Sequence, residues 1–326
     1  MNRLITLDDF IDTYAKTRQR GFQFISSKFN FNSIKRTKSA WNASDIQASN
    51  WWIIPKVQQR WNQLITSDET LQYEKFVVEN YLDSNTKVKM LSLGSGSCSH
   101  ELCFASHKDF FEDILCVDIS NHVLDEAKKI AKERNLENIS FLAKSIYDYD
   151  FPEKEFDIVM FHASLHHFMD MDDLVENKIK KTLKSNGKLI INEYVGPNRL
   201  QYPSHQIKAI NEAIQIIPKK YRKRFKLDIH KNKVYGSGLI RMILADPSEC
   251  VESQNILPAI HNQFNTVYEA FYGGNILMTA LKDISHHFIN LDAEKEKVLN
   301  TLFEFEDRYL EENPSDFVFG IYEIRK

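Results

Sequence analysis

Short apolar runs alternate with amphipathic stretches between about residues 87 and 195. Five of the runs have the length and composition of strands, at 88–93, 113–119, 138–144, 156–164 and 188–196. The stretches between them include two with a helical period, and the second ends at Gly187, a residue type common just beyond a helix C-terminus. The alternation predicts an α/β fold with a parallel, doubly wound sheet.

Residues 1–85 have a helical pattern, with helix starts predicted at Thr6 and Ser67. All four tryptophans of the chain lie in this segment: Trp41, Trp51, Trp52 and Trp61. Buried aromatic rings dominate core packing, so we favour a core role for them over a lid whose rings cover a ligand. The segment is predicted to be an N-terminal helical cap.

Two helical inserts and two more strands are predicted after residue 196. The inserts lie at about 197–245 and 275–313, and the strands at 265–274 and 316–326. Residues 86–326 are thus expected to form one Rossmann-like domain with a sheet of seven strands.

Charge and cysteine content exclude several classes of protein. The formal net charge is -3, which argues against a general nucleic-acid binder. The four cysteines contain no CxxC pair, so neither a zinc ribbon nor a disulfide framework is indicated. Three aspartates stand near the N-terminus where a signal peptide needs an apolar run, and no apolar stretch approaches the ~20 residues of a membrane span. We expect a cytoplasmic protein with no membrane span and no nucleic-acid partner.

The stretch LSLGSGSCSHEL, residues 91–102, predicts a nucleotide site. Gly94, Ser95 and Gly96 follow the first strand, where glycine permits close approach of backbone to a ligand. Asp118 ends the second strand, 24 positions after Gly94, where a carboxylate can accept hydrogen bonds from both hydroxyls of a ribose.

NAD is the first alternative for this loop. It requires a third glycine, packed beneath a pyrophosphate, at the position that Ser99 occupies here. A nucleoside without phosphates has no such requirement, and its tail could carry a carboxylate and an amine.

The order LSLGSG, CVDIS, FLAKSIYDYDF, FDIVMFHASLHHF and LKSNGKLIINEY resembles the class I S-adenosylmethionine-dependent methyltransferases. The resemblance covers about residues 87–195. It implies that the last two of the seven strands form an antiparallel pair. It also implies S-adenosyl-L-methionine as cofactor and S-adenosyl-L-homocysteine as product.

The resemblance also assigns the cofactor-binding residues. Gly94 and Gly96, with Ser95 between them, would line the methionine moiety, and Asp118 would hold the ribose. The other implied contacts are Ile119 on the adenine, Ser145 and Ile146 near the adenine amine, and His162 beside the sulfonium.

Three positions depart from the family pattern. Ser92 stands where many members have an acid, Cys98 where many have glycine, and Ser145 where many have aspartate. The first departure suggests that another group handles the amine of the ligand.

Stretches outside the core resemble a little-characterised bacterial branch of the family, which is associated with surface-polysaccharide or secondary-metabolite methylation. They are ASNWWIIPKVQQRWNQLI, NEYVGPNR, DPSECVESQNILP and FYGGN.

Candidate catalytic groups follow the fourth and fifth strands. A hydroxyl acceptor benefits from a general base, usually His or Glu, and the candidates are His166, His167 and Glu193. The alternative for the histidines is that one caps the next helix and the other packs in the core. Acceptor-binding candidates are Tyr194, Asn198, Arg199 and Tyr272.

No metal site is expected, because the histidines lack the fuller ligand set that zinc prefers and the oxygen ligands that Mg²⁺ prefers. The basic run at 219–233 is either a solvated helix face, the favoured interpretation, or an anion site for a charged acceptor.

The leading hypothesis is therefore a methyltransferase that acts on an O or N atom of a small-molecule or saccharide acceptor. A nucleic-acid methyltransferase is disfavoured, since HASL stands where an (N/D)PP(Y/F) tetrad is usual and no two prolines are adjacent. A protein methyltransferase and a non-catalytic adaptor of the same fold are the remaining alternatives.

Overall fold

The structure is a computed structural model that describes residues 3–20 and 49–325. The chain divides into two compact units, each assembled from separate stretches of sequence. The first comprises residues 1–64, 196–249 and 271–317, and the second comprises residues 65–195, 250–270 and 318–326. Among the described residues, no helix combines the length and the hydropathy that a membrane span requires.

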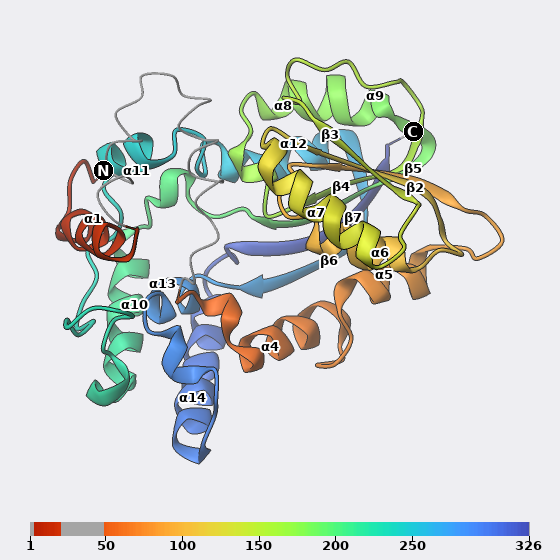
Figure 1. Ribbon diagram of the computed structural model, residues 1–326. Helices are drawn as coiled ribbons and strands as arrows, with labels where there is room; N and C mark the ends of the chain where they lie inside the picture. The colour runs from red at the N-terminus through yellow and green to blue at the C-terminus, as the bar shows by residue number, and fades with distance from the viewer. Residues whose placement is uncertain (1–2, 21–48, 326) are drawn as a thin grey trace. The chain divides into compact units, whose positions relative to one another are not determined.

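A seven-stranded sheet forms the centre of the second unit, in the order β3-β2-β1-β4-β5-β7-β6 (Figure 1). The strands are β1 (Val88–Leu93), β2 (Phe111–Asp118), β3 (Ile139–Ala143), β4 (Phe156–His162), β5 (Leu183–Tyr194), β6 (Phe264–Gly273) and β7 (Phe317–Ile324). The first five are parallel, and the last pair is antiparallel. The predicted doubly wound sheet is confirmed. Its order reverses between β1 and β4, which is the switch point where such sheets bind ligands.

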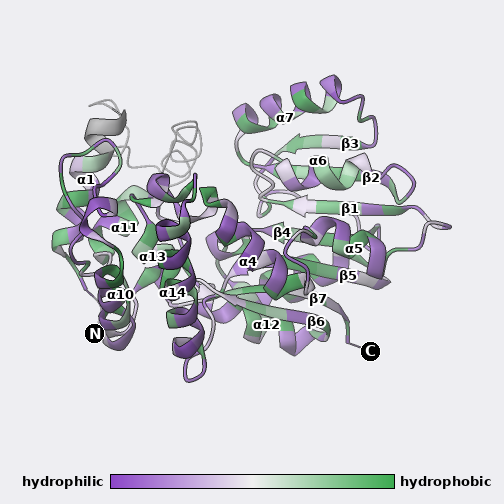
Figure 2. Ribbon diagram, turned by 90° about the horizontal axis from the view of Figure 1, so that it is seen from below, coloured by the Kyte–Doolittle hydropathy of each residue, from purple (hydrophilic) through white to green (hydrophobic). Residues whose placement is uncertain are grey.

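Helices cover the sheet because parallel strands carry apolar side chains on both faces. On one face, Leu91, Val159 and Leu189 are fully buried in a cluster with side chains from the helical stretch after β4 and from α12. The neighbouring strand positions, such as Met90 and Ile158, are buried as well. The helices of this unit are α5 (Tyr73–Tyr81), α6 (Ser99–Ser106), α7 (Asn121–Glu133), α8 (Met171–Asp173), a π-helical turn (Leu174–Ile179), α9 (Lys180–Thr182) and α12 (Ile256–Gln263). Figure 2 shows the hydrophobic side of α7 turned toward β3.

The helix predicted to end at Gly187 is five residues shorter than expected. It stops at Thr182, and Gly187 lies inside β5. Three extra residues of β5 are inserted there into the pairing with β4, since Phe156 pairs with Leu183 and Ile158 pairs with Lys188. A Cβ on Gly187 would lie 2.9 Å from Leu183 Cδ2, so this glycine permits close packing within a bulge and does not cap a helix.

The two predicted helix starts have different outcomes. The first is confirmed: α1 (Leu7–Arg20) begins after Thr6, whose N–H donates to Asp9 Oδ2 at 2.7 Å. The start at Ser67 is wrong, because α5 begins only at Tyr73. Asp68 instead forms a turn by accepting the N–H of Thr70 at 2.8 Å.

The first unit is mainly helical. Its other helical elements are η1 (Trp51–Ile53), α4 (Pro55–Thr66), η4 (Asn198–Leu200), α10 (Ser204–Ile216), η5 (Lys219–Tyr221), α11 (Leu239–Ala245), α13 (Leu277–Leu281), η7 (Ser285–Phe288) and α14 (Ala293–Leu310). Trp51 is buried in its core, edge-on to Trp61 at a centroid distance of 4.7 Å. Trp52 is exposed, and Trp41 lies outside the described residues.

The basic run at 219–233 does not form the solvated helix face that was expected. It contains only the three-residue helix Lys219–Tyr221. Lys231 is buried and donates to the carbonyl oxygens of Thr279 and Lys282 at 2.5 and 2.7 Å, at the end of α13. Arg224 is buried beside Asp283. These cations are used inside the unit, where they satisfy carbonyl and carboxylate oxygens.

Asp316 makes the stability of the first unit depend on pH. The carboxyl is 3% exposed and accepts a hydrogen bond from Gln206 at 2.7 Å. Burial raises its pKa from the ordinary 3.8 to about 7, although the bond from Gln206 lowers it. Between pH 4 and pH 7 the folded chain therefore holds a proton that the unfolded chain releases, so stability falls as pH rises through this window.

We expect Asp316→Asn to remove this pH dependence. From pH 5.0 to 7.5, the free energy of unfolding should fall less in the variant than in the unmodified protein, by on the order of 2 kcal/mol. Urea denaturation at the two pH values measures the difference. The exposed Asp109 offers a control, Asp109→Asn, that should leave the pH dependence unchanged. An equal fall in all three proteins would contradict the assignment.

Candidate cofactor and catalytic site

The loop after β1 is tied to the end of β2 by its own backbone. Gly94 and Gly96 have φ angles of +68° and +52°, in the left-handed region that favours glycine. The N–H groups of Gly94 and Ser95 both donate to the carbonyl of Val117, at 2.8 and 3.1 Å. The N–H of Gly96 donates to Asp118 Oδ2 at 3.0 Å. The three N–H groups that a phosphate-binding loop would offer are thus used within the protein, which fits a ligand without phosphates.

Asp118 is oriented by backbone donors on both sides. The side chain is 6% exposed. Oδ1 accepts the N–H of Ser120 at 2.7 Å and Oδ2 accepts that of Gly96. A carboxylate oriented in this way has the chemistry to accept hydrogen bonds from hydroxyl groups.

Gly94 also brings the ends of β1 and β4 together. A Cβ on Gly94 would lie 2.7 Å from Ser164 Cβ, a distance at which one of the two loops must move. Ser164 Oγ donates to the carbonyl of Leu93 at 2.8 Å. The close approach of the two loops therefore requires glycine at position 94.

Ser92 has a carboxyl partner that sequence reasoning missed. Ser92 and Glu101 are both buried, and Ser92 Oγ donates to Glu101 Oε1 at 2.5 Å. Burial raises the pKa of Glu101. An acid is thus present beside the position where the family often has one, but it comes from the first turn of α6. The glutamate in the segment SHEL, Glu101, is the sequence feature that could have indicated this acid.

The other predicted adenine contacts lie just beyond β2 and β3. Ile119 and Ser145 are half-buried, and Ile146 is buried in the core cluster that contains Val117. Ser145 Oγ accepts the N–H of Tyr147 at 3.2 Å. Their contacts with a cofactor stay predictions.

Glu193 holds the turn after β4. Its side chain is fully buried at the end of β5. Oε1 accepts the N–H groups of Ser164 and Leu165 at 2.5 and 2.6 Å, and Oε2 lies 2.8 Å from His166 Nδ1. Both oxygens are engaged, so the geometry favours Glu193 as the group that positions His166.

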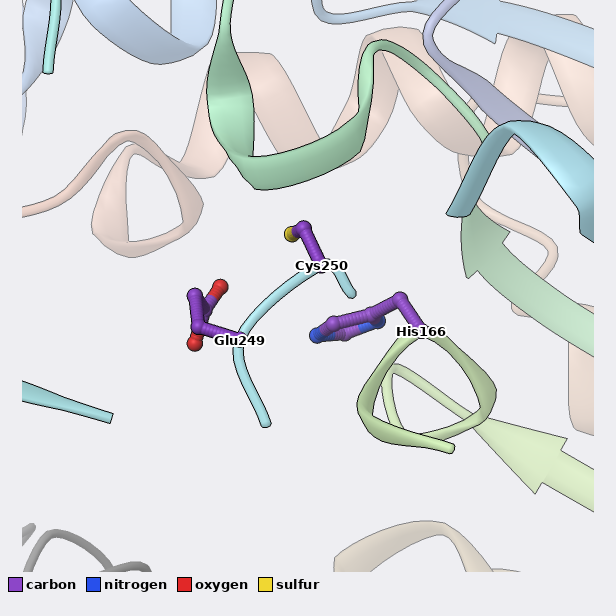
Figure 3. Close-up of side chains that lie close together, drawn as sticks. All are labelled: His166, Glu249 and Cys250. Atoms are coloured by element: carbon purple, nitrogen blue, oxygen red, sulfur yellow. The ribbon is translucent and has the colours of Figure 1, made fainter. Parts of the chain in front are cut away.

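His166 lies beside a buried thiol. Figure 3 shows the His166 ring on the turn after β4 and the Cys250 side chain on a neighbouring segment. A ring nitrogen of His166 and Cys250 Sγ lie within 4.8 Å, and the N–H of Val251 donates to the His166 carbonyl at 3.2 Å. The rings of His167 and Tyr194 lie 4.3 and 6.4 Å from the His166 ring.

His162 belongs to a cluster that sequence reasoning did not foresee. Its Nδ1 lies 2.9 Å from the hydroxyl of Tyr73, and its ring stacks on His100 at a centroid distance of 3.5 Å. His100 Nδ1 in turn lies 2.5 Å from Glu74 Oε1. Burial, with a contribution from His100, lowers the pKa of His162 well below its usual range.

The predicted acceptor residues are divided between the units. Tyr194 lies in the second unit, whereas Asn198, Arg199 and Tyr272 lie in the first. Arg199 donates to the carbonyl of Glu249 at 3.1 Å. Tyr272 is buried, with its ring 6.0 Å from that of Trp61.

Residues 84–245 match a family model described as a methyltransferase domain. The chain is 26% identical over 129 residues to the uncharacterized methyltransferase YcgJ of Bacillus subtilis, covering 36% of this chain and 49% of that protein. It is 30% identical over 84 residues to the uncharacterized protein YafE of Escherichia coli, covering 26% and 40%. The matches thus span about half the length of these relatives or less.

Two solved structures are among those to which the chain is similar. The crystal structure of YcgJ from Bacillus subtilis has a TM-score of 0.40 and 18% identity, with 77% of this chain and 96% of that chain covered. Geranyl diphosphate C-methyltransferase from Streptomyces coelicolor has a TM-score of 0.46 and 11% identity, with 77% and 78% covered. The family match covers 162 of the 326 residues, and the strand order and the Gly94–Asp118 loop agree with this similarity of residues 84–245 to a methyltransferase domain.

Proposed function

We propose that the chain transfers a methyl group from S-adenosyl-L-methionine to an O or N atom of a small-molecule or saccharide acceptor, with S-adenosyl-L-homocysteine as product. One observation carries the proposal: the carboxylate of Asp118, held by Gly96 and Ser120 at the switch point of the sheet. It has the chemistry to accept both hydroxyls of a ribose. The loop N–H groups bonded to Val117 argue against a pyrophosphate ligand and therefore against NAD.

The residues at the switch point fit the parts of this cofactor. When bound, S-adenosylmethionine supplies a methyl group on a positively charged sulfur. Asp118 would hold the ribose, and Gly94, Ser95 and Gly96 would line the methionine tail. Glu101, buried beside Ser92, is the nearby carboxyl that could receive the amine, a role that the family often gives to an acid at position 92.

His166 is our candidate for the general base. A hydroxyl or amine acceptor releases one proton when it takes the methyl group, and a positioned imidazole can receive that proton. Glu193 fixes the ring through Nδ1, which makes Nε2 the nitrogen that accepts the proton. The same logic of a carboxylate that orients a histidine operates in catalytic triads. His167 is the second candidate.

The segments outside the sheet are our candidates for the part of the chain that selects the acceptor. We propose that the N-terminal helical cap (1–85) and the inserts at about 197–245 and 275–313 determine which acceptor is used. Tyr194, Asn198, Arg199 and Tyr272 are the proposed contacts. The bacterial branch that the sequence resembles points to a saccharide or a secondary metabolite.

Transfer of a methyl label tests the function directly. The protein is incubated with methyl-labelled S-adenosylmethionine and an extract of its own host, beside an Asp118→Ala control. Label in the small-molecule or polysaccharide fraction, only with the unmodified protein, is the expected result. Label in the protein or nucleic-acid fraction would mean that the acceptor is a protein or a nucleic acid. Cofactor binding without label in any fraction would favour a non-catalytic adaptor.

Asp118→Ala should weaken binding of S-adenosylhomocysteine at least about 100-fold, because two hydrogen bonds to a charged group are lost. Isothermal titration calorimetry measures the affinity. Glu112→Ala, an exposed carboxylate on the same strand, is the matched control and should bind normally. Near-normal affinity in Asp118→Ala would remove the ribose assignment.

His166→Asn should lower kcat by about 10²–10⁴, the usual contribution of a general base, and leave cofactor affinity unchanged. Glu193→Gln should lower kcat and change the pH profile of kcat, because the ring that it positions loses its charged partner. The double variant should be little worse than His166→Asn alone, since the two residues act as one unit. His122→Asn, an exposed histidine on α7, is the control. Unchanged turnover in His166→Asn would move the base assignment to His167.

A further inference from the structure

Helix α1 buries its acids and exposes its apolar side chains, which is the reverse of the usual arrangement of a surface helix. Asp9 and Asp12 are 7% and 8% exposed, whereas Leu7 and Phe10 are 54% and 67% exposed. At 3.6 residues per turn the two acids lie on one side of the helix. Leu7, Phe10 and Tyr14 lie on the opposite side.

The acids fasten α1 to other helices of the first unit. Asp9 Oδ1 accepts the N–H of Gly238 and Nε of Arg241, both at 2.8 Å. Asp12 Oδ2 lies 3.2 Å from Arg241 Nη2 and 2.8 Å from Nζ of Lys282, which follows α13. A Cβ on Gly238 would collide with the carboxylate of Asp9. These contacts determine which side of α1 faces the unit, and they leave the apolar side outward.

Helix α11 extends the outward apolar side of α1. It lies beside α1 in both ribbon views (Figure 1, Figure 2). The N–H of Ile240 donates to the carbonyl of Leu4 at 3.2 Å, so the exposed side chains of the two segments adjoin. The α1/α11 face consists of eight large side chains that are each 40% to 67% exposed: Leu4, Ile5, Leu7, Phe10, Tyr14, Ile240, Ile243 and Leu244.

The size of the α1/α11 face fits a protein interface. Eight large side chains with this exposure offer on the order of 800 Å² of surface, which is what each partner buries in a stable complex. Monomeric proteins rarely expose a contiguous apolar patch larger than a few hundred Å². A face of this kind in water therefore indicates a surface that another apolar surface covers.

The charges around the α1/α11 face argue against a lipid surface as its partner. Anionic lipids attract basic side chains that stand beside apolar ones. The part of α1 whose side chains are described, residues 7–15, carries three acids and no basic residue. On α11, Arg241 is paired with Asp9 and Asp12.

We propose that the α1/α11 face is the interface of a two-fold dimer of this chain. In such a dimer the same face meets itself, so it must be complementary to itself. An apolar face whose neighbouring acids and arginine are paired with one another meets this condition, because it brings no like charges together. The proposal does not depend on the proposed function.

Sedimentation velocity over a range of micromolar concentrations tests the dimer. Four proteins are compared: the unmodified chain, Phe10→Glu, Ile243→Glu and the control Val267→Glu. Val267 lies on β6 in the second unit and is 40% exposed, like Ile243. The unmodified protein and the control should dimerise. Each face variant should weaken the dimer at least about 100-fold, because two carboxylates, one from each copy, are then buried in the apolar interface.

The other occupants of the face are distinguished by the same set of proteins. An unmodified protein that stays monomeric, or a dimer that both face variants leave intact, would overturn the proposal. Flotation with vesicles of phosphatidylcholine and phosphatidylglycerol should show no binding. Binding that Phe10→Glu abolishes would assign the face to a lipid surface instead.

A second measurement does not depend on the fold of the glutamate variants. Tyr14→Cys should be linked into a dimer by a short bismaleimide, whereas Val267→Cys and the unmodified protein, with its own cysteines, should not. Linkage of Val267→Cys without linkage of Tyr14→Cys would place the contact between copies elsewhere and contradict the proposal.

Discussion

The hydrogen bonds of one fully buried carboxylate hold the candidate site together. Glu193 binds two successive N–H groups of the turn after β4 and also His166. A buried carboxylate is stable only when hydrogen-bond donors surround it. Here the donors belong to the turn after β4, so the same hydrogen bonds also hold that turn in place. Ser164 is the first of the two residues whose N–H groups bind Glu193. Its side chain occupies the space that a Cβ at Gly94 would need, and its Oγ donates to the carbonyl of Leu93. The positions of the glycine loop after β1 and of His166, the candidate base, therefore depend on the same side chain.

Two of the carboxylate–histidine pairs in the second unit have different surroundings. Glu193 meets His166 at the end of β5, where the carboxylate also has backbone donors and serves to orient the ring. Glu74 lies beside His100, whose ring stacks on a second ring, His162. The same pair of residue types thus lies among backbone donors in one place and against a second imidazole in the other.

The first unit uses charge mainly for its own packing. Lys231 and Arg224 lie in a run that looks solvent-exposed by composition, yet both are buried against oxygen atoms near α13. Arg241 pairs with Asp9 and Asp12 of α1 in the same way. Such pairs link α1 to α11, and a cation that is paired within the protein contributes less to binding an anionic acceptor.

The parallel strands and the glycine loop after β1 could be predicted from the sequence, because both follow from local patterns. Short apolar runs identify the strands, and the positive φ of Gly94 in the turn after β1 favours glycine there. Asp118 was predictable for the same reason, since it ends a strand whose position the pattern shows. The bulge at Gly187 could not be predicted, because glycine is common both at the end of a helix and at a close contact within a strand. Only the register between β4 and β5 shows that Gly187 lies in a strand.

The sequence by itself determined the parallel strands of the sheet and the glycine loop after β1, both of which depend on residues near one another in the chain. The tertiary structure decided the roles of the polar groups. Glu101 beside Ser92, Glu74 beside His100 and His100 on His162 are contacts between different elements. The charge and orientation of a buried side chain are set by the partners that folding brings to it, and no local pattern in the sequence records those partners.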